Sequence, residues 1–154
     1  MKNSGLLFFT LLLTAFMAGC KDSGEQAVGK VNNEFSYPTT GYSYKAYNSK
    51  GDLVVEGTLK LTVTKEGDVS GTWTLAKKGQ SDNVGPQVGS GSLSGKRDGS
   101  SISINLNPGW ADNNVFLNGK IEGTAITGTW SWSTFAGPTS EGRFEAAGVY
   151  IEQP

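Results

Sequence analysis

The chain has 154 residues, and its 13 basic and 14 acidic residues give a net charge of −1. Such a balance gives no electrostatic footprint for nucleic acid, so we expect no nucleic-acid partner. Histidine is absent, which excludes imidazole acid/base catalysis, histidine-dependent nucleophiles and histidine metal sites. We therefore expect a protein that is not an enzyme and needs no cofactor.

The chain opens with the pattern of an export signal. Lys2 supplies a positive charge, and residues 6–18 form an uncharged, largely apolar run of the length of a signal-peptide core. The run is too short to cross a bilayer, which needs about 20 apolar residues. We expect residues 1–19 to be a signal peptide that is removed from the mature protein.

The apolar run ends on Met17-Ala18-Gly19-Cys20, which resembles the lipobox of bacterial lipoproteins. The resemblance implies cleavage before Cys20 and acyl chains on its thiol, which would anchor the protein to a membrane of the bacterial envelope. Cys20 is the only cysteine, so no intramolecular disulfide can form. We expect the outer membrane, with the protein facing the periplasm or the surface. An ordinary secretory signal with a chance cysteine is the alternative.

A flexible linker is expected after the lipidated cysteine. Residues 20–40 are rich in polar residues, glycine and asparagine and show no sustained period. The apolar exceptions offer an alternative, an early strand or a plug against the domain; they are Val28, Val31, Phe35 and Tyr37.

From Gly41 onward apolar and polar residues alternate between glycine-marked turns, which is the pattern of half-buried β-strands. The expected strands are residues 42–47, 53–64, 69–76, 89–96, 101–106, 115–121, 125–132 and 142–147. Short connections between successive strands imply an antiparallel meander. The predicted domain covers residues 41–150, and residues 151–154 form a C-terminal tail.

The two faces of these strands differ in chemistry. One face gathers valine, leucine, isoleucine, tryptophan and glycine, while the other carries threonine, serine, asparagine and lysine. Large residues alternating with glycine suit the interior of a small closed barrel. We predict an all-β fold, a small antiparallel β-barrel of about eight strands, with a β-sandwich as the alternative. Most predicted strands are shorter than the roughly 9 to 11 residues of a transmembrane barrel.

A Gly-Thr-Trp element occurs twice on these strands, at residues 71–73 and 128–130. With eight short meandering strands, these elements resemble the calycin group of small barrels, the avidin-like and lipocalin-like proteins, over residues 42–147. None of the biotin-contacting positions of avidin is placed in this sequence, so biotin binding is not carried over. Bacterial lysozyme-inhibitor lipoproteins are also small anchored barrels, but they commonly hold a disulfide that this chain cannot form.

Three tryptophans, Trp73, Trp130 and Trp132, lie on the inward face of the predicted strands. An eight-stranded barrel is either filled by its side chains or wide enough for one small ligand. We expect these indoles to be core residues, with a small apolar or aromatic ligand between them as the alternative.

The loop 107–114 is the second candidate site. Trp110 has the flat apolar ring that stacks on a sugar, and Asp112, Asn113 and Asn114 have oxygens that bind hydroxyl groups or Ca²⁺. The plain interpretation is a turn, because Asn-Pro-Gly reverses the chain and Asp or Asn caps it. No calcium-loop spacing is present, so no metal site is predicted.

Taken together, these patterns predict a membrane-anchored, non-enzymatic binding or interaction module. Its ligand would be a small apolar molecule in the barrel or a glycan at the loops. A structural envelope protein with a solid barrel is one alternative, and an inhibitor of a secreted hydrolase, acting through its loops, is the other.

Overall fold

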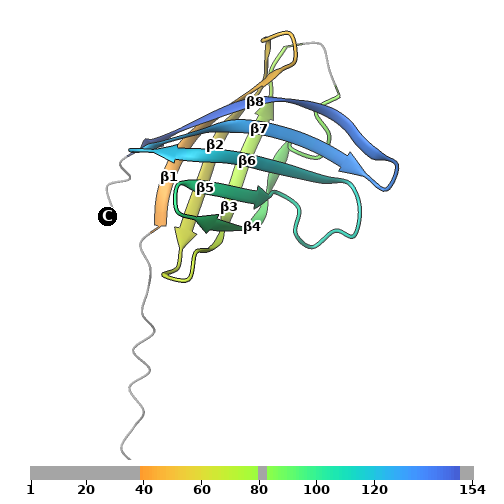
Figure 1. Ribbon diagram of the computed structural model, residues 1–154. Coiled ribbons are helices and arrows are strands. Elements are labelled where there is room, and N and C mark those ends of the chain that lie inside the picture. The colour runs from red at the N-terminus through yellow and green to blue at the C-terminus, as the bar shows by residue number, and fades with distance from the viewer. Residues whose placement is uncertain (1–38, 80–82, 150–154) are drawn as a thin grey trace, which may run out of the picture. The chain divides into compact units, whose positions relative to one another are not determined.

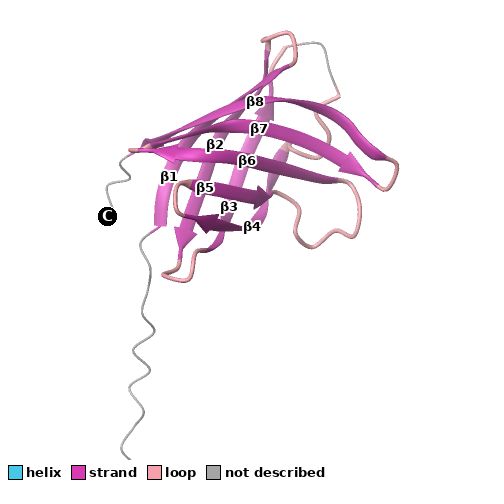
Figure 2. Ribbon diagram, viewed as in Figure 1, coloured by secondary structure: helices cyan, strands magenta, loops and turns pink. Residues whose placement is uncertain are grey.

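The computed structural model describes residues 39–79 and 83–149, which form eight β-strands and no helix (Figure 2). Each strand pairs antiparallel with its neighbours in the chain, and β8 pairs with β1, so the sheet closes into a barrel (Figure 1). This topology confirms the predicted meander barrel and not the sandwich. The strands are β1 (Thr39–Asn48), β2 (Leu53–Val63), β3 (Asp68–Lys77), β4 (Gly89–Asp98), β5 (Ser101–Asn105), β6 (Asn114–Glu122), β7 (Ala125–Thr134) and β8 (Gly137–Val149).

All eight predicted strands are present, and most are longer than predicted. β1 begins two residues before the predicted domain start, because Thr39 and Thr40 of the predicted linker pair with Thr62 and Leu61 of β2. The predicted signal peptide, Cys20, the rest of the predicted linker and the predicted tail lie outside the described residues. Within the described part of the chain, no helix has the length and apolar character that crossing a membrane requires.

The face that the alternation assigned to the interior is the buried one. With Val84 and Leu106 from the connections, this face forms a core of Tyr44, Ala46, Val54, Val55, Leu59, Leu61, Val69, Trp73, Leu75, Val84, Leu93, Ile102, Ile104, Leu106, Val115, Leu117, Ile126, Trp130, Phe144 and Ala146. The outward face carries exposed residues such as Lys60, Thr72 and Lys120. All strands except β5, which has five residues, reach the length of transmembrane strands, so length is a weak argument against that class. The orientation of the two faces argues against it, because an outer-membrane barrel turns its apolar side outward.

Two inward glycines face each other across neighbouring strands, Gly119 on β6 and Gly128 on β7. A Cβ atom on Gly128 would lie 2.0 Å from the carbonyl oxygen of Asn118 and 2.5 Å from the Cα atom of Gly119. Only a residue without a side chain allows the two backbones to approach so closely.

The connections divide the barrel into two ends. The turn end holds the turns 64–67, 99–100 and 123–124 together with Thr39 and Val149, the first and last described residues. The loop end holds the β1–β2 turn, the described parts of the β3–β4 connection, the β5–β6 loop and the β7–β8 turn. Both candidate sites predicted from the sequence involve the loop end.

Candidate functional site

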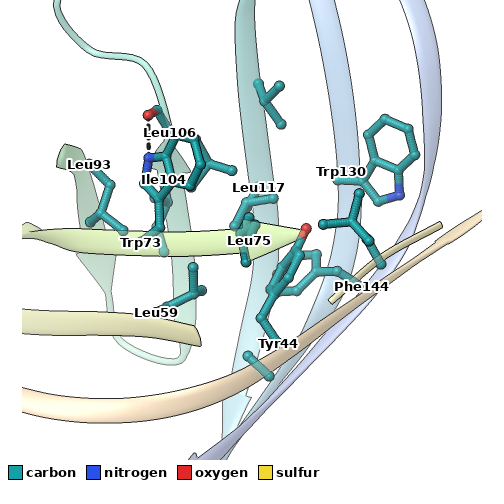
Figure 3. Packing of buried hydrophobic residues seen from close by; sticks show 14 of the residues in the cluster. Tyr44, Leu59, Trp73, Leu75, Leu93, Ile104, Leu106, Leu117, Trp130 and Phe144 are labelled. Carbon is teal, nitrogen blue, oxygen red and sulfur yellow. Dashed lines mark hydrogen bonds between the residues drawn. The ribbon is translucent and has the colours of Figure 1, made fainter. Parts of the chain in front are cut away.

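The inward tryptophans Trp73 and Trp130 are core residues. Trp130 has no solvent-exposed surface and Trp73 is 4% exposed. The Trp130 indole N–H donates to the carbonyl oxygen of Tyr47 at 2.9 Å, and that of Trp73 donates to the carbonyl oxygen of Leu106 at 2.7 Å (Figure 3). Water reaches neither Trp130 nor its neighbours Val115 and Leu117, all at 0% exposure. Side chains fill this part of the barrel.

The mouth of the barrel at the loop end is plugged by residues of the β3–β4 connection. Val84 and Gln87 are buried, with Gln87 at 0% exposure. The Gln87 amide donates to the carbonyl oxygen of Val84 at 2.9 Å, and its oxygen accepts from the hydroxyl of buried Tyr44 at 3.4 Å. Burial raises the pKa of Tyr44 well above its usual value, so this hydroxyl stays a neutral donor.

The third inward tryptophan, Trp132, is half-buried and lies against this plug. Gly85 has a positive φ of 64°, and a Cβ atom there would lie 2.5 Å from the Trp132 ring. The Trp132 indole N–H donates to Oδ1 of Asn113 at 2.5 Å. Trp132 therefore joins the β3–β4 connection to the β5–β6 loop.

The three polar candidates of the β5–β6 loop are used to fold the loop. Oδ1 of Asp112 accepts from the backbone N–H groups of Asn113 at 2.7 Å and Phe135 at 2.8 Å. The Asn114 amide donates to the carbonyl oxygen of Trp110 at 3.2 Å, while its Oδ1 is buried without a hydrogen-bond partner. With Asn113 bonded to Trp132, these side chains are oriented by the protein rather than toward a ligand beside Trp110. The turn interpretation holds, since the Trp110 N–H donates to the carbonyl oxygen of Asn107 at 3.1 Å.

A gap in the barrel wall adjoins Trp110. β4 begins at Gly89, but its pairing with β5 begins only at Ser94 opposite Asn105, so no described strand lies beside residues 89–93 on that side. Trp73 bridges one end of this gap. Its indole N–H contacts the carbonyl oxygen of Ser92 at 3.3 Å in addition to that of Leu106.

We call the resulting groove the loop-end slot. It has a volume of about 300 Å³ and is lined by Trp73, Pro86, Val88, Ser90, Gly91, Ser92, Leu106, Asn107, Pro108, Gly109 and Trp110. None of these residues is ionisable. Of the seven predicted ligand residues, the slot brings together only Trp73 and Trp110. Asn107 of this lining is held by contacts of its own, accepting from the Val115 N–H at 3.3 Å and donating to the carbonyl oxygen of Pro86 at 3.5 Å.

Large apolar side chains are exposed at the rim of the loop end. Trp110 is 56% exposed, Val88 45% and Phe135, in the β7–β8 turn, 83%. Sequence reasoning identified Trp110 but missed Val88, Ser90 and Ser92. The available signal was the excess length of the predicted strand 89–96 over the neighbouring strand 101–106, which leaves the start of the longer strand without a partner.

No family model matches the chain, and no curated protein matches it. Among solved structures, rhizavidin in its biotin complex is similar with a TM-score of 0.48 and 18% identity, covering 73% of this chain and 95% of rhizavidin. Bradavidin2 in its biotin complex is similar with a TM-score of 0.49 and 17% identity, covering 75% of this chain and 99% of bradavidin2. Both are avidins by name, but likeness at this level indicates nothing about this chain's ligand, and the barrel follows from its own strand pairing.

Proposed function

We propose that the protein is a non-enzymatic binding module and that the loop-end slot is its ligand site. The observation that carries this proposal is a groove of about 300 Å³ whose wall includes an exposed tryptophan, Trp110. This volume is at the lower limit of ligand sites, which begin at about 300 Å³. The slot offers no acid or base for catalysis, because none of its lining residues is ionisable.

The lining of the slot suits a small ring with one apolar face, such as a sugar. The Trp110 indole and the Val88 side chain supply apolar walls, and Ser90 and Ser92 supply polar atoms. This replaces the predicted polar partners Asp112, Asn113 and Asn114 by the β4 serines. An apolar ligand deep in the barrel has less support, because Trp130 and its neighbours leave no space that water can enter.

A binding assay with Trp110→Ala tests the proposal. We expect the full chain to bind members of a neutral sugar panel and the variant to lose about tenfold or more in affinity, since one aromatic contact at a binding site is worth about 1 to 3 kcal/mol. Phe135→Ala is the matched control, because Phe135 is also exposed at the loop end but does not line the slot. Equal binding by Trp110→Ala and the unaltered chain contradicts the proposal.

We also propose that acyl chains on Cys20 hold this domain at a bacterial envelope membrane. The support is the lipobox-like sequence before Cys20. We expect Cys20→Ser to move the protein from the detergent phase to the aqueous phase in phase partitioning, because two or more acyl chains are needed for stable anchoring. A detergent-phase Cys20→Ser protein contradicts the anchor.

A further inference from the structure

We infer that the ligand of the loop-end slot carries a secondary amide on a neutral sugar ring, that is, an N-acetylated amino sugar. The inference rests on the proposed function and names the ligand class of the same site. The feature behind it is the free edge of β4, which presents peptide groups to the slot.

The direction of the free peptide groups follows from the position of Trp73. Its indole N–H contacts the carbonyl oxygens of Ser92 and Leu106 together, so the Ser92 carbonyl faces the gap. In an antiparallel strand the N–H and C=O of one residue point to the same side, and successive residues alternate. Ser90, two residues earlier, therefore directs its N–H and its C=O into the slot, where no described strand is paired with it.

Ser90 offers a ligand one donor, its N–H, and one acceptor, its C=O, side by side. One trans amide cannot bond to both, because its own N–H and C=O point in opposite directions, so two groups of the ligand are needed. An acetamido carbonyl is a strong acceptor for the Ser90 N–H, and a hydroxyl on the neighbouring ring carbon can donate to the Ser90 carbonyl. An N-acetylated amino sugar carries this pair of groups, whereas glucose has only a hydroxyl to accept from the N–H.

The walls define the rest of the ligand. Trp110 and Val88 contact an apolar face, and the absence of charge among the lining residues disfavours an ammonium, a carboxylate or a phosphate. The slot is also short, because Trp73 closes one end of it by bridging the carbonyl oxygens of Ser92 and Leu106. A blind groove of about 300 Å³ takes one ring and its substituent, whereas an added peptide strand needs an edge that stays open along several residues.

The test compares three probes on the full chain in detergent micelles. They are N-acetylglucosamine, glucose, which has a hydroxyl in place of the acetamido group, and N-acetylglycine N-methylamide, a peptide-like amide without a sugar. We expect N-acetylglucosamine to bind about tenfold tighter than glucose, the effect of losing buried hydrogen bonds worth about 1.4 kcal/mol. The amide without a ring should bind weakly, because it has no face for Trp110.

Two variants of Ser90 isolate the main-chain donor. Ser90→Pro removes the N–H that faces the slot and leaves alone the pairing of β4 with β3, which uses the peptide groups of Gly89 and Gly91. We expect it to reduce the affinity for N-acetylglucosamine about tenfold. Ser90→Ala keeps this N–H and removes only the hydroxyl, so it should lose less affinity than Ser90→Pro. Independently of any variant, the Ser90 amide resonance should be among those that shift most on titration.

The outcomes separate the inference from the proposed function. Equal affinity for glucose and N-acetylglucosamine, with Trp110 still required, overturns the amide inference and leaves the sugar site in place. Tighter binding of the peptide-like amide than of either sugar makes the edge a peptide site and overturns the ligand class. Binding of no probe, with no shift at Ser90 or Trp110, overturns both.

Discussion

At the residue scale, each inward tryptophan fills space and also donates a hydrogen bond to another segment of the barrel. Trp130 reaches the β1 carbonyl of Tyr47, Trp73 reaches Leu106 just after β5, and Trp132 reaches Asn113 in the β5–β6 loop. A buried indole N–H needs such a partner, because an unsatisfied donor costs about 1 to 3 kcal/mol. The sequence pattern left open whether these tryptophans are core residues or walls of a ligand site. The hydrogen bonds explain why they serve mainly as core residues.

Asn113 provides a direct test of this role. It is the one non-glycine residue of the described chain with a positive φ, 67°, a conformation that asparagine tolerates better than most residues. We expect Asn113→Ala to lower the free energy of unfolding by about 1 to 3 kcal/mol, because it loses the acceptor for Trp132. Asn113→Asp keeps an oxygen that can accept from Trp132, so it should lose the least stability. Asn113→Gly tolerates the conformation but lacks the acceptor, so its loss of unfolding free energy should fall between those of Asn113→Ala and Asn113→Asp. Urea unfolding in which Asn113→Asp costs as much as Asn113→Ala contradicts the hydrogen-bond role.

Tyr44 predicts how stability changes at alkaline pH. Burial raises its pKa above the usual value of about 10, while its ring packs on Phe144 with centroids 5.8 Å apart. Above about pH 10 the unfolded chain releases this proton and the folded chain keeps it, so stability falls with rising pH by up to about 1.4 kcal/mol per unit. Below that pH its contribution is fully present.

Denaturant unfolding between about pH 8 and about pH 11 measures this effect. Tyr44→Phe should have a shallower decline than the unaltered chain, because the titrating hydroxyl is gone. Part of the decline should remain, because the pKa of Tyr42 is raised by burial and that of Tyr47 by its hydrogen bond to Glu145. Identical declines for the two proteins would show that Tyr44 titrates alike in the folded and unfolded chains.

At the element scale, the strands follow from the sequence and the slot does not. Alternation from Gly41 onward predicted all eight strands and their inward face, because burial on one side leaves a period of two. The plug formed by Val84 and Gln87 has no such period, since a loop residue is buried by tertiary packing alone. The slot depends on the difference in length between β4 and β5. The positions where strands end are the feature that a sequence pattern predicts least well.

The glycine pair of β6 and β7 tests the geometry of the sheet. Gly128→Ala places a methyl group against backbone atoms of Asn118 and Gly119, which cannot move without disturbing the sheet. We expect a loss of about 1 to 3 kcal/mol or more in unfolding free energy. Gly109→Ala is the control, because a Cβ atom there has no neighbour within 4 Å, and it should change stability by less than about 0.5 kcal/mol. Equal stability of the two variants contradicts the close approach of the strands.

At the scale of the whole barrel, the two ends differ in structure. The turn end receives the chain at Thr39 and is closed by short turns, whereas the loop end combines a plugged mouth with the slot and the exposed side chains of Trp110 and Phe135. The loop 107–114 forms the turn that its sequence indicates, and a sugar beside Trp110 stays a proposal. Its amides fold it, and Trp110 remains exposed beside the free edge of β4.

The four tryptophans of the chain permit one measurement that tests the central claim, that the ligand binds in the slot and not in the barrel. Each indole N–H gives its own resonance in a ¹H–¹⁵N spectrum, and the full chain is titrated with N-acetylglucosamine. We expect the indole signals of Trp110 and Trp73 to shift and that of Trp130 to stay in place, because only the first two line the slot. A shift of Trp130 without a shift of Trp110 would put the ligand inside the barrel and contradict binding in the slot.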